Sequence, residues 1–329
     1  MPRCTTFTFQ DPSRYQAAIR PAEVALFPTA SGKFHATLTH VDFDRLWIQF
    51  GNESLPRVAH STLPNRANIA FLADPNQPPA KYWGTEISSD AVVLGVPGSS
   101  RHVRSYAACR WATMSLTPDD LSAVSAALTG CELRLGSTIR VIHPEPEHMA
   151  RLVRLYAATM KLAHSAPEIL TQPEVSNALE QELIHAMVTC LLDDTRVDIS
   201  AGWRHHSEII TRFEDYLAAN CDQPFYLTQI CSATKVSERT LRICCQEHLG
   251  MGPRKYLWLR RMHLARRALI RQDPATATVT QIATQYGFWH PGRFAVCYLK
   301  LFGESPSLTL HRPDDPKISS ENNSVVVRT

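Results

Sequence analysis

Two short stretches of the sequence place hydrogen-bond donors at what would be the start of a helix. The first is Ser237, followed by Glu238, Arg239, Thr240 and Arg242. A serine at this position caps a helix by accepting a hydrogen bond from a free backbone N–H. The forked donors of an arginine then suit the edge of a guanine or a phosphate. The spacing therefore predicts a helix start that contacts nucleic acid.

The second stretch is Trp289, His290, Pro291, Gly292 and Arg293. Proline suits the first position of a helix, where its missing N–H costs no hydrogen bond. The other four residues are then left at the exposed start of that helix, where base edges are contacted. We expect the helix to end at Gly303, and its buried face is predicted from four apolar residues: Phe294, Tyr298, Leu301 and Phe302.

Each stretch follows a shorter predicted helix and a tight turn. In the first unit we expect Thr228 to cap the shorter helix and Lys235–Val236 to make the turn. Ile230 and Cys231 are expected to face inward. In the second unit Gly287 supplies the positive φ that such a turn requires. The pattern is that of two helix-turn-helix units, whose second helix enters the major groove of DNA.

One long helix, Pro253–Arg271, is predicted between the two units. Its 19 residues would span roughly 28 Å, and one turn of B-DNA rises about 34 Å. The two recognition helices could therefore reach successive major grooves, whereas the alternative is a generic helical bundle with exposed arginines. The expected basic side consists of Arg254, Lys255, Arg260, Arg261, Arg266 and Arg267.

The charge distribution favours the same partner. Residues 204–312 carry 15 Lys and Arg against 8 Asp and Glu, although the net charge of all 329 residues is only +3. A basic region on a slightly acidic body indicates a polyanion as its partner, which here would be double-stranded DNA.

The motifs Gln281–Phe288, Gly292–Phe294 and Phe302–Pro306, with Val236–Leu241 in the first unit, resemble the AraC/XylS family of transcription regulators. The resemblance covers residues 207–312. It implies a seven-helix domain that binds promoter DNA, usually as a homodimer and usually as an activator, with RNA polymerase as a further partner. Three positions depart from the family pattern: Lys235 replaces a turn glycine, Cys231 an alanine and Cys245 a core phenylalanine.

The first 116 residues show the alternation and the turn signals of short strands. Residues 34–40, 46–50, 68–72, 91–96 and 111–116 are predicted strands, and Gly51–Asn52 is a predicted turn. Helices follow, with a start at Thr117–Pro118 and two longer segments over 147–163 and 174–192. The apolar stripe of the last segment is either a core face or a dimer seam.

Together these observations predict an α+β protein. Residues 1–195 would form an effector-sensing and dimerisation domain, which resembles a cupin-like β-barrel with trailing helices. Residues 205–312 would form an all-α domain of two helix-turn-helix units joined by a long helix, and residues 313–329 a flexible tail. The expected effector-binding residues of the first domain are Trp47, Arg57, Trp83, His102 and Trp111.

Two classes of enzyme are the alternatives. A cupin-type metalloenzyme needs several histidines and a carboxylate around a metal, but His35 and His40 have no downstream acidic partner in a His-x-His motif. A DNA-alkylation repair protein needs a zinc site, for which Cys4, Cys109 and Cys131 are too scattered. We therefore expect no enzyme activity, no metal and no cofactor.

The composition also narrows the location. No stretch approaches the roughly 18 consecutive apolar residues of a membrane span, and the N-terminus lacks the pattern of a secretion signal. The nine cysteines are odd in number and include no Cys-x-x-Cys pair, so neither a disulfide framework nor a zinc knuckle is indicated. We expect a cytoplasmic, nucleoid-associated protein without a membrane partner.

Overall fold

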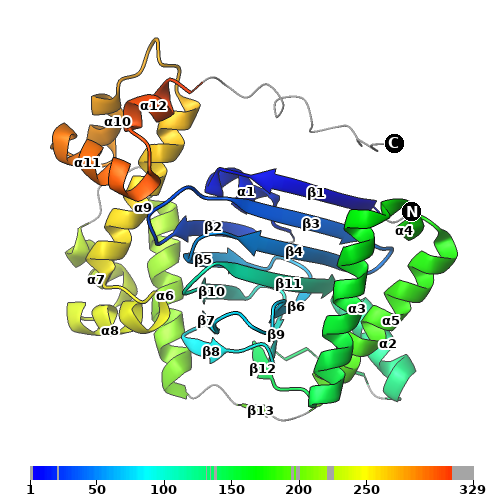
Figure 1. Ribbon diagram of the computed structural model, residues 1–329. Coiled ribbons are helices and arrows are strands. Elements are labelled where there is room, and N and C mark those ends of the chain that lie inside the picture. Colours follow the sequence, from blue (N-terminus) through cyan, green and yellow to red (C-terminus); the bar gives the residue numbers. More distant parts are fainter. Residues whose placement is uncertain are drawn as a thin grey trace. The chain divides into compact units, whose positions relative to one another are not determined.

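A computed structural model describes residues 3–20, 22–130, 132–133, 135–136, 139–193, 196–197, 201–220 and 226–312 (Figure 1). The chain forms two compact units, one up to Arg260 and one from Arg261 onward. None of the helices in the described ranges is long and apolar enough to cross a membrane. The described elements give an α+β fold, as the sequence predicts.

The first unit contains two antiparallel sheets. The larger has eight strands in the order β1-β3-β4-β11-β6-β9-β12-β13, and the smaller has five in the order β2-β5-β10-β7-β8. The strands of the larger sheet are β1 (Arg3–Phe9), β3 (Ala36–Asp42), β4 (Trp47–Glu53), β6 (Ala67–Leu72), β9 (Val92–Gly95), β11 (Cys109–Leu116), β12 (Arg140–Ile142) and β13 (Arg196–Val197). Those of the smaller sheet are β2 (Glu23–Pro28), β5 (Arg57–Thr62), β7 (Ala80–Tyr82), β8 (Thr85–Ile87) and β10 (Ser100–Arg104).

The central strands of the larger sheet are buried on both faces. In β11, Trp111 belongs to a core between the two sheets, whereas its neighbour Ala112 and also Met114 belong to a second core on the opposite face. The same alternation separates Val93 from Leu94 in β9, because successive side chains of a strand point to opposite faces. The first unit is therefore a sandwich of two sheets with a further layer of helices.

Helices cover the second core (Figure 1). They are α2 (Pro118–Thr129), α3 (Pro146–Ser165), α4 (Pro167–Leu170) and α5 (Pro173–Leu192), whereas α1 (Pro12–Ala18) precedes β2. Thr117 caps α2 by accepting a hydrogen bond from the Asp120 backbone, as predicted. Leu183, Met187 and Leu191 of α5 lie in the core of their own chain. The apolar stripe of 174–192 is thus a core face, and its use as a dimer seam is wrong.

The five predicted strands correspond to β3, β4, β6, β9 and β11. The turn predicted at Gly51–Asn52 is wrong, because both residues lie inside β4. A Cβ added to Gly51 would stand 2.2 Å from the indole of Trp111 on β11. The glycine therefore makes room for a neighbouring ring and does not reverse the chain.

The remaining helices are divided between the two units. The first unit contains α6 (Ala201–Ala219), α7 (Leu227–Thr234) and α8 (Glu238–His248), and the second contains α10 (Val279–Gln285), α11 (Pro291–Phe302) and α12 (Pro306–Leu310). α9 (Pro253–Arg271) has the predicted bounds, and the division between the units falls within it. The predicted spacing of the recognition helices on DNA stays a prediction, and the tail 313–329 lies outside the described residues.

Candidate DNA-binding surfaces

The first helix-turn-helix unit consists of α7, a three-residue turn over Lys235–Ser237 and α8. Lys235 ends α7 with φ +57°, a conformation that is uncommon for a residue with a side chain. The Ser237 side chain caps α8 by accepting a hydrogen bond from the Thr240 backbone at 3.1 Å. Leu241 and Cys245 are fully buried behind the helix. The turn, the cap and the inner face of this unit are therefore as predicted.

Two details of the first helix-turn-helix unit differ from the sequence prediction. Thr228 does not cap α7, because the helix begins one residue earlier at Leu227 and Tyr226 occupies the cap position. Ile230 is fully buried as expected, but Cys231 is only half-buried. Cys231 thus lies at the edge of the packed face.

The exposed start of α8 carries two arginines, of which one is paired with an acid. Arg242 donates to Glu238 at 3.1 Å across one helical turn, and Arg254 approaches the same carboxylate at 3.7 Å. Arg239 is exposed and makes no hydrogen bond or ion pair that the structure records with a described residue. Arg239 is thus the readier donor for DNA, whereas Glu238 holds Arg242 near the helix surface.

In the second helix-turn-helix unit, a capping box begins α10 and aromatic rings pack behind α11. Thr278 accepts a hydrogen bond from the Gln281 backbone, and the Gln281 side chain accepts one in return from the Thr278 backbone. Gly287 has φ +78° at the turn, as predicted. Phe294, Tyr298 and three neighbouring rings pack with centroid distances of 4.6–5.5 Å, and the other members are Phe288, Phe302 and His263. All four residues predicted for the inner face of α11 are buried.

The beginning of α11 is exposed over all the predicted positions. Trp289 is 69% exposed, and His290, Pro291, Gly292 and Arg293 are also exposed. Pro291 is the first helical residue, and His290 occupies the cap position without a side-chain hydrogen bond. The predicted residues therefore form one accessible surface at a helix start.

The predicted basic side of α9 divides into exposed and buried arginines. Arg260 donates to Glu214 at 2.7 Å, and both side chains are almost fully buried. In the second unit, Arg266 pairs with Glu304 at 2.9 Å. The prediction that Arg260 and Arg266 belong to the basic side of α9 is wrong. Each is buried and neutralises a buried carboxylate, that of Glu214 or Glu304. Arg254 and Lys255 are exposed, as expected, whereas Arg261 and Arg267 are half-buried.

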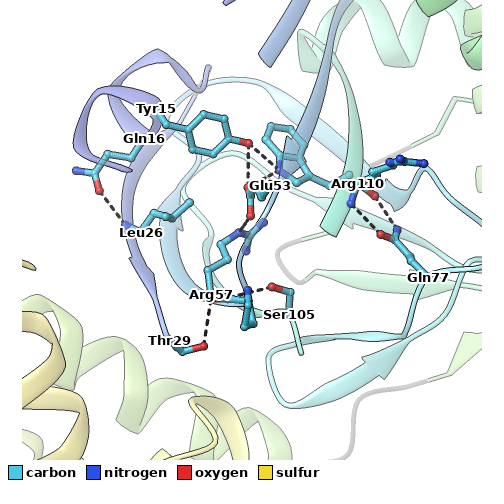
Figure 2. Close-up of polar contacts among 11 residues, drawn as sticks. Tyr15, Gln16, Leu26, Thr29, Glu53, Arg57, Gln77, Ser105 and Arg110 are labelled. Atoms are coloured by element: carbon cyan, nitrogen blue, oxygen red, sulfur yellow. Dashed lines mark hydrogen bonds and ion pairs between the residues drawn. The ribbon is translucent and has the colours of Figure 1, made fainter. Parts of the chain in front are cut away.

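Two of the expected effector-binding residues meet in a buried polar cluster between the sheets (Figure 2). Glu53 of β4 accepts from Arg57 Nε at 2.5 Å, from the Trp111 indole at 2.7 Å and from the Tyr15 hydroxyl at 2.9 Å. Burial opposes the charge on Arg57, but the Glu53 carboxylate outweighs it and raises the pKa of the guanidinium. Sequence reasoning missed Glu53 and Tyr15. The sequence offered little signal for Glu53, because this residue follows the turn that was predicted at Gly51–Asn52 and lies outside the predicted strand 46–50.

The other three expected residues are not hydrogen-bond partners of Glu53. Trp47 is half-buried, with the Arg66 guanidinium stacked 4.1 Å from its ring. The Trp83 indole donates to the Ser100 carbonyl at 2.8 Å. His102 on β10 is 3.3 Å from His60, measured between their Nδ1 atoms. The Trp83 backbone N–H donates to the His102 carbonyl at 2.9 Å, but the five residues are not joined in one cluster of side-chain hydrogen bonds.

A metal site is absent from the part of the chain that the structure describes. No group of three or more His, Cys, Asp or Glu residues is arranged there to hold an ion. His35 is exposed and His40 is buried. Cys4 and Cys109 contribute to no such group, and Cys131 lies outside the described residues.

Comparison with known proteins assigns the helix-turn-helix region. A family described as "Helix-turn-helix domain" matches residues 230–312. The chain is 36% identical over 143 residues to a probable thc operon regulatory protein of Rhodococcus erythropolis, which covers 43% of each chain. It is 30% identical over 129 residues to XylDLEGF operon transcriptional activator 2 of Pseudomonas putida, a match that covers 38% of this chain and 82% of the relative.

The chain belongs to the AraC/XylS family of transcription regulators. Membership in this family favours a regulator over both enzyme classes. The match still covers less than half the length of the thc regulatory protein and 34% of XylDLEGF operon transcriptional activator 3. Among solved structures, the AraC-like transcriptional activator CuxR is 16% identical with a TM-score of 0.43, over 85% of this chain and all of that one.

Proposed function

We propose that this chain is a sequence-specific DNA-binding transcription regulator that activates nearby catabolic or stress genes. The observation that carries the proposal is the pair of exposed helix starts, α8 and α11, each placed by a tight left-handed turn. Residues at the start of a second helix are those that reach base edges in the major groove. The proposed contacts are Ser237, Glu238, Arg239, Thr240 and Arg242 in the first unit, and Trp289, His290, Pro291, Gly292 and Arg293 in the second.

The regulatory role is supported by the relatives. The R. erythropolis relative is a probable regulator of the thc operon, and the P. putida relatives are activators of the XylDLEGF operon. We extend this role to the present chain, with double-stranded promoter DNA and RNA polymerase as partners in the cytoplasm. Homodimerisation belongs to the same proposal, although the α5 stripe is not its interface.

The effector-sensing role is assigned to the two-sheet region, with residues 1–195 as its proposed domain and 205–312 as the DNA-binding domain. Two of the proposed effector contacts have a buried nitrogen without a hydrogen-bond partner among the described residues, Arg57 at Nη1 and His102 at Nε2. A buried donor without a partner is costly. A small molecule that accepts a hydrogen bond there would remove that cost.

The DNA-binding assignment is tested with Arg239→Ala and Arg293→Ala in the full chain. A bidentate contact from arginine to guanine contributes about 1–3 kcal/mol of discrimination against a wrong base. Each substitution should therefore relax sequence preference in one half of a site that has been selected from random duplexes. The measurement is competition binding against single-base variants of that site.

Lys255→Ala is the matched control, because Lys255 is exposed on α9 and can contact phosphates only. It should weaken binding to all sequences alike. If the two arginine variants also lowered affinity uniformly across the panel, α8 and α11 would not read bases. If no sequence were selected at all, the regulator function itself would be contradicted.

A further inference from the structure

The outward face of α11 carries an apolar strip. Val296 is 67% exposed and Leu299 is 52% exposed, and they are one helical turn apart. Trp289, just before the helix, is 69% exposed. Large apolar side chains are normally buried, so their concentration on one short helix marks a surface that meets a partner.

Gly292, one turn before Val296, is not required by the fold. A Cβ built on it would meet no atom within 4 Å, and its φ is not in the left-handed region. Glycine disfavours a helix relative to alanine. Its place on the exposed surface therefore suits an occupant that must approach the backbone closely.

The charges around this apolar face suit DNA better than a protein surface. Residues 261–312 carry seven Lys and Arg against two Asp and Glu. Of the two acids, Glu304 is already paired with Arg266 and Arg312. Arg293 and Lys300 are both exposed on α11 itself. An apolar strip between such cations matches a major groove, where thymine methyl groups lie between two rows of phosphates.

We propose that α11 reads thymine methyl groups, with Val296 as the specificity-determining residue and Gly292 as the point of closest approach. The inference rests on the proposed DNA-binding function and names the bases that one half of the site contains. Apolar side chains contact the C5-methyl of thymine, which is the one apolar group in the major groove. Val296 accordingly selects A·T pairs over G·C pairs without a hydrogen bond.

The first recognition helix has a different outward face, which gives the inference an internal reference. Counted from the caps Ser237 and His290, Val296 corresponds to Ile243, which is 44% exposed. The positions of Gly292 and Leu299 correspond in α8 to Arg239 and Gln246, both exposed. α8 therefore offers hydrogen-bond donors on both sides of its aliphatic residue, whereas α11 offers none there.

The test replaces single thymines by deoxyuridine, which lacks only the C5-methyl, in a site selected from random duplexes by the full chain. Burial of one methyl corresponds to about a fourfold change in affinity. We expect a loss of this size at one or two thymines in the half contacted by α11. The Val296→Ala protein should bind the thymine site about fourfold more weakly and should not distinguish thymine from deoxyuridine.

Two further variants fix the interpretation. Leu308→Ala is the matched control, because Leu308 is a 60% exposed apolar residue on α12 of the same unit; it should still distinguish the two bases. Gly292→Leu should weaken binding at least as much as Val296→Ala while the melting temperature is maintained, because Gly292 is exposed and an added Cβ meets no atom within 4 Å.

The inference is overturned if the unmodified protein binds deoxyuridine and thymine sites equally, or if Val296→Ala weakens both equally. Normal DNA binding by Val296→Ala together with reduced transcription would also overturn it, and would assign the apolar face to RNA polymerase. Failure to select any site would instead contradict the proposed function.

Discussion

The two recognition helices, α8 and α11, have similar lengths but are held in place by different means. α8 is capped by the Ser237 side chain and packs through Leu241 and two small thiols, Cys244 and Cys245, all fully buried. α11 lacks a side-chain hydrogen bond at its cap and is backed by aromatic rings. The stability of α8 therefore depends on its N-terminal cap and on the elements around it, whereas the stability of α11 depends on the aromatic core behind it.

The C-terminal ends of the helices extend this difference. α11 ends at Gly303, which has a left-handed conformation. A glycine at this position is a local signal that can be recognised in the sequence. α8 ends at His248, whose ring lies 6.5 Å from that of His102 on β10. Within residues 1–260, α8 is therefore in contact with the five-stranded sheet. Its position depends on residues that are far away in the sequence.

The largest effect is expected from truncating the aromatic core of the second unit. Phe294→Ala should destabilise that unit by about 3–5 kcal/mol, as a deleted buried ring does. Cys245→Ala in the first helix-turn-helix unit, at the position that corresponds to Tyr298 of α11, should cost about 1 kcal/mol because only one heavy atom is removed. Hydrogen exchange of peptides from α8 and α11 in increasing urea measures both losses. Equal losses would show that the two helices are held by cores of similar strength.

A pH-dependent effect is expected for α8. Burial lowers the pKa of His248 to about 4, and burial together with neighbouring histidines lowers the pKa of His102 well below 6.5. Between pH 6.5 and about 4 the unfolded chain therefore binds more protons than the folded one. The free energy of unfolding of α8 and its surroundings falls as the pH is lowered through this range. A shift of this size in His248 corresponds to about 3 kcal/mol.

The charged groups around these rings set the control for this prediction. His206, Glu247 and Lys81 act on His248, whereas Glu214, Asp215 and Arg260 act on His60. His248→Gln should make hydrogen-exchange protection of α8 less dependent on pH, while α11 in the same sample supplies the reference. Unchanged protection of α8 in the wild-type chain between pH 7 and 5 would contradict the prediction.

The smallest effect is expected at the caps. Ser237→Ala should destabilise the start of α8 by about 1 kcal/mol, because the backbone N–H of Thr240 loses its acceptor. His290→Ala should change little, whereas His290→Ser should stabilise α11 by up to about 1 kcal/mol by adding a cap. Exchange rates of the first-turn amides report these changes. Comparable losses in the two alanine variants would argue that His290 caps α11 through a contact absent from the structure.

The boundaries of the recognition helices could be predicted from the sequence because their signals are local. Ser237, Pro291 and Gly303 act through backbone groups within four residues, so their effect does not depend on the rest of the fold. The same holds for the apolar spacing that predicted the buried face of α11. Membership in a helix-turn-helix family, and with it the candidate DNA contacts, follows from this short-range information.

The tertiary structure decided which polar residues are buried. Arg260 and Arg266 have the same spacing as exposed arginines on α9, and only Glu214 and Glu304, from other elements, bring them inside. Glu53 likewise accepts hydrogen bonds in the interior only because Trp111 and Tyr15 donate to it from distant segments of the chain. A pattern along one helix or strand gives the direction of a side chain, but a charge can be buried only where a partner from elsewhere in the chain neutralises it.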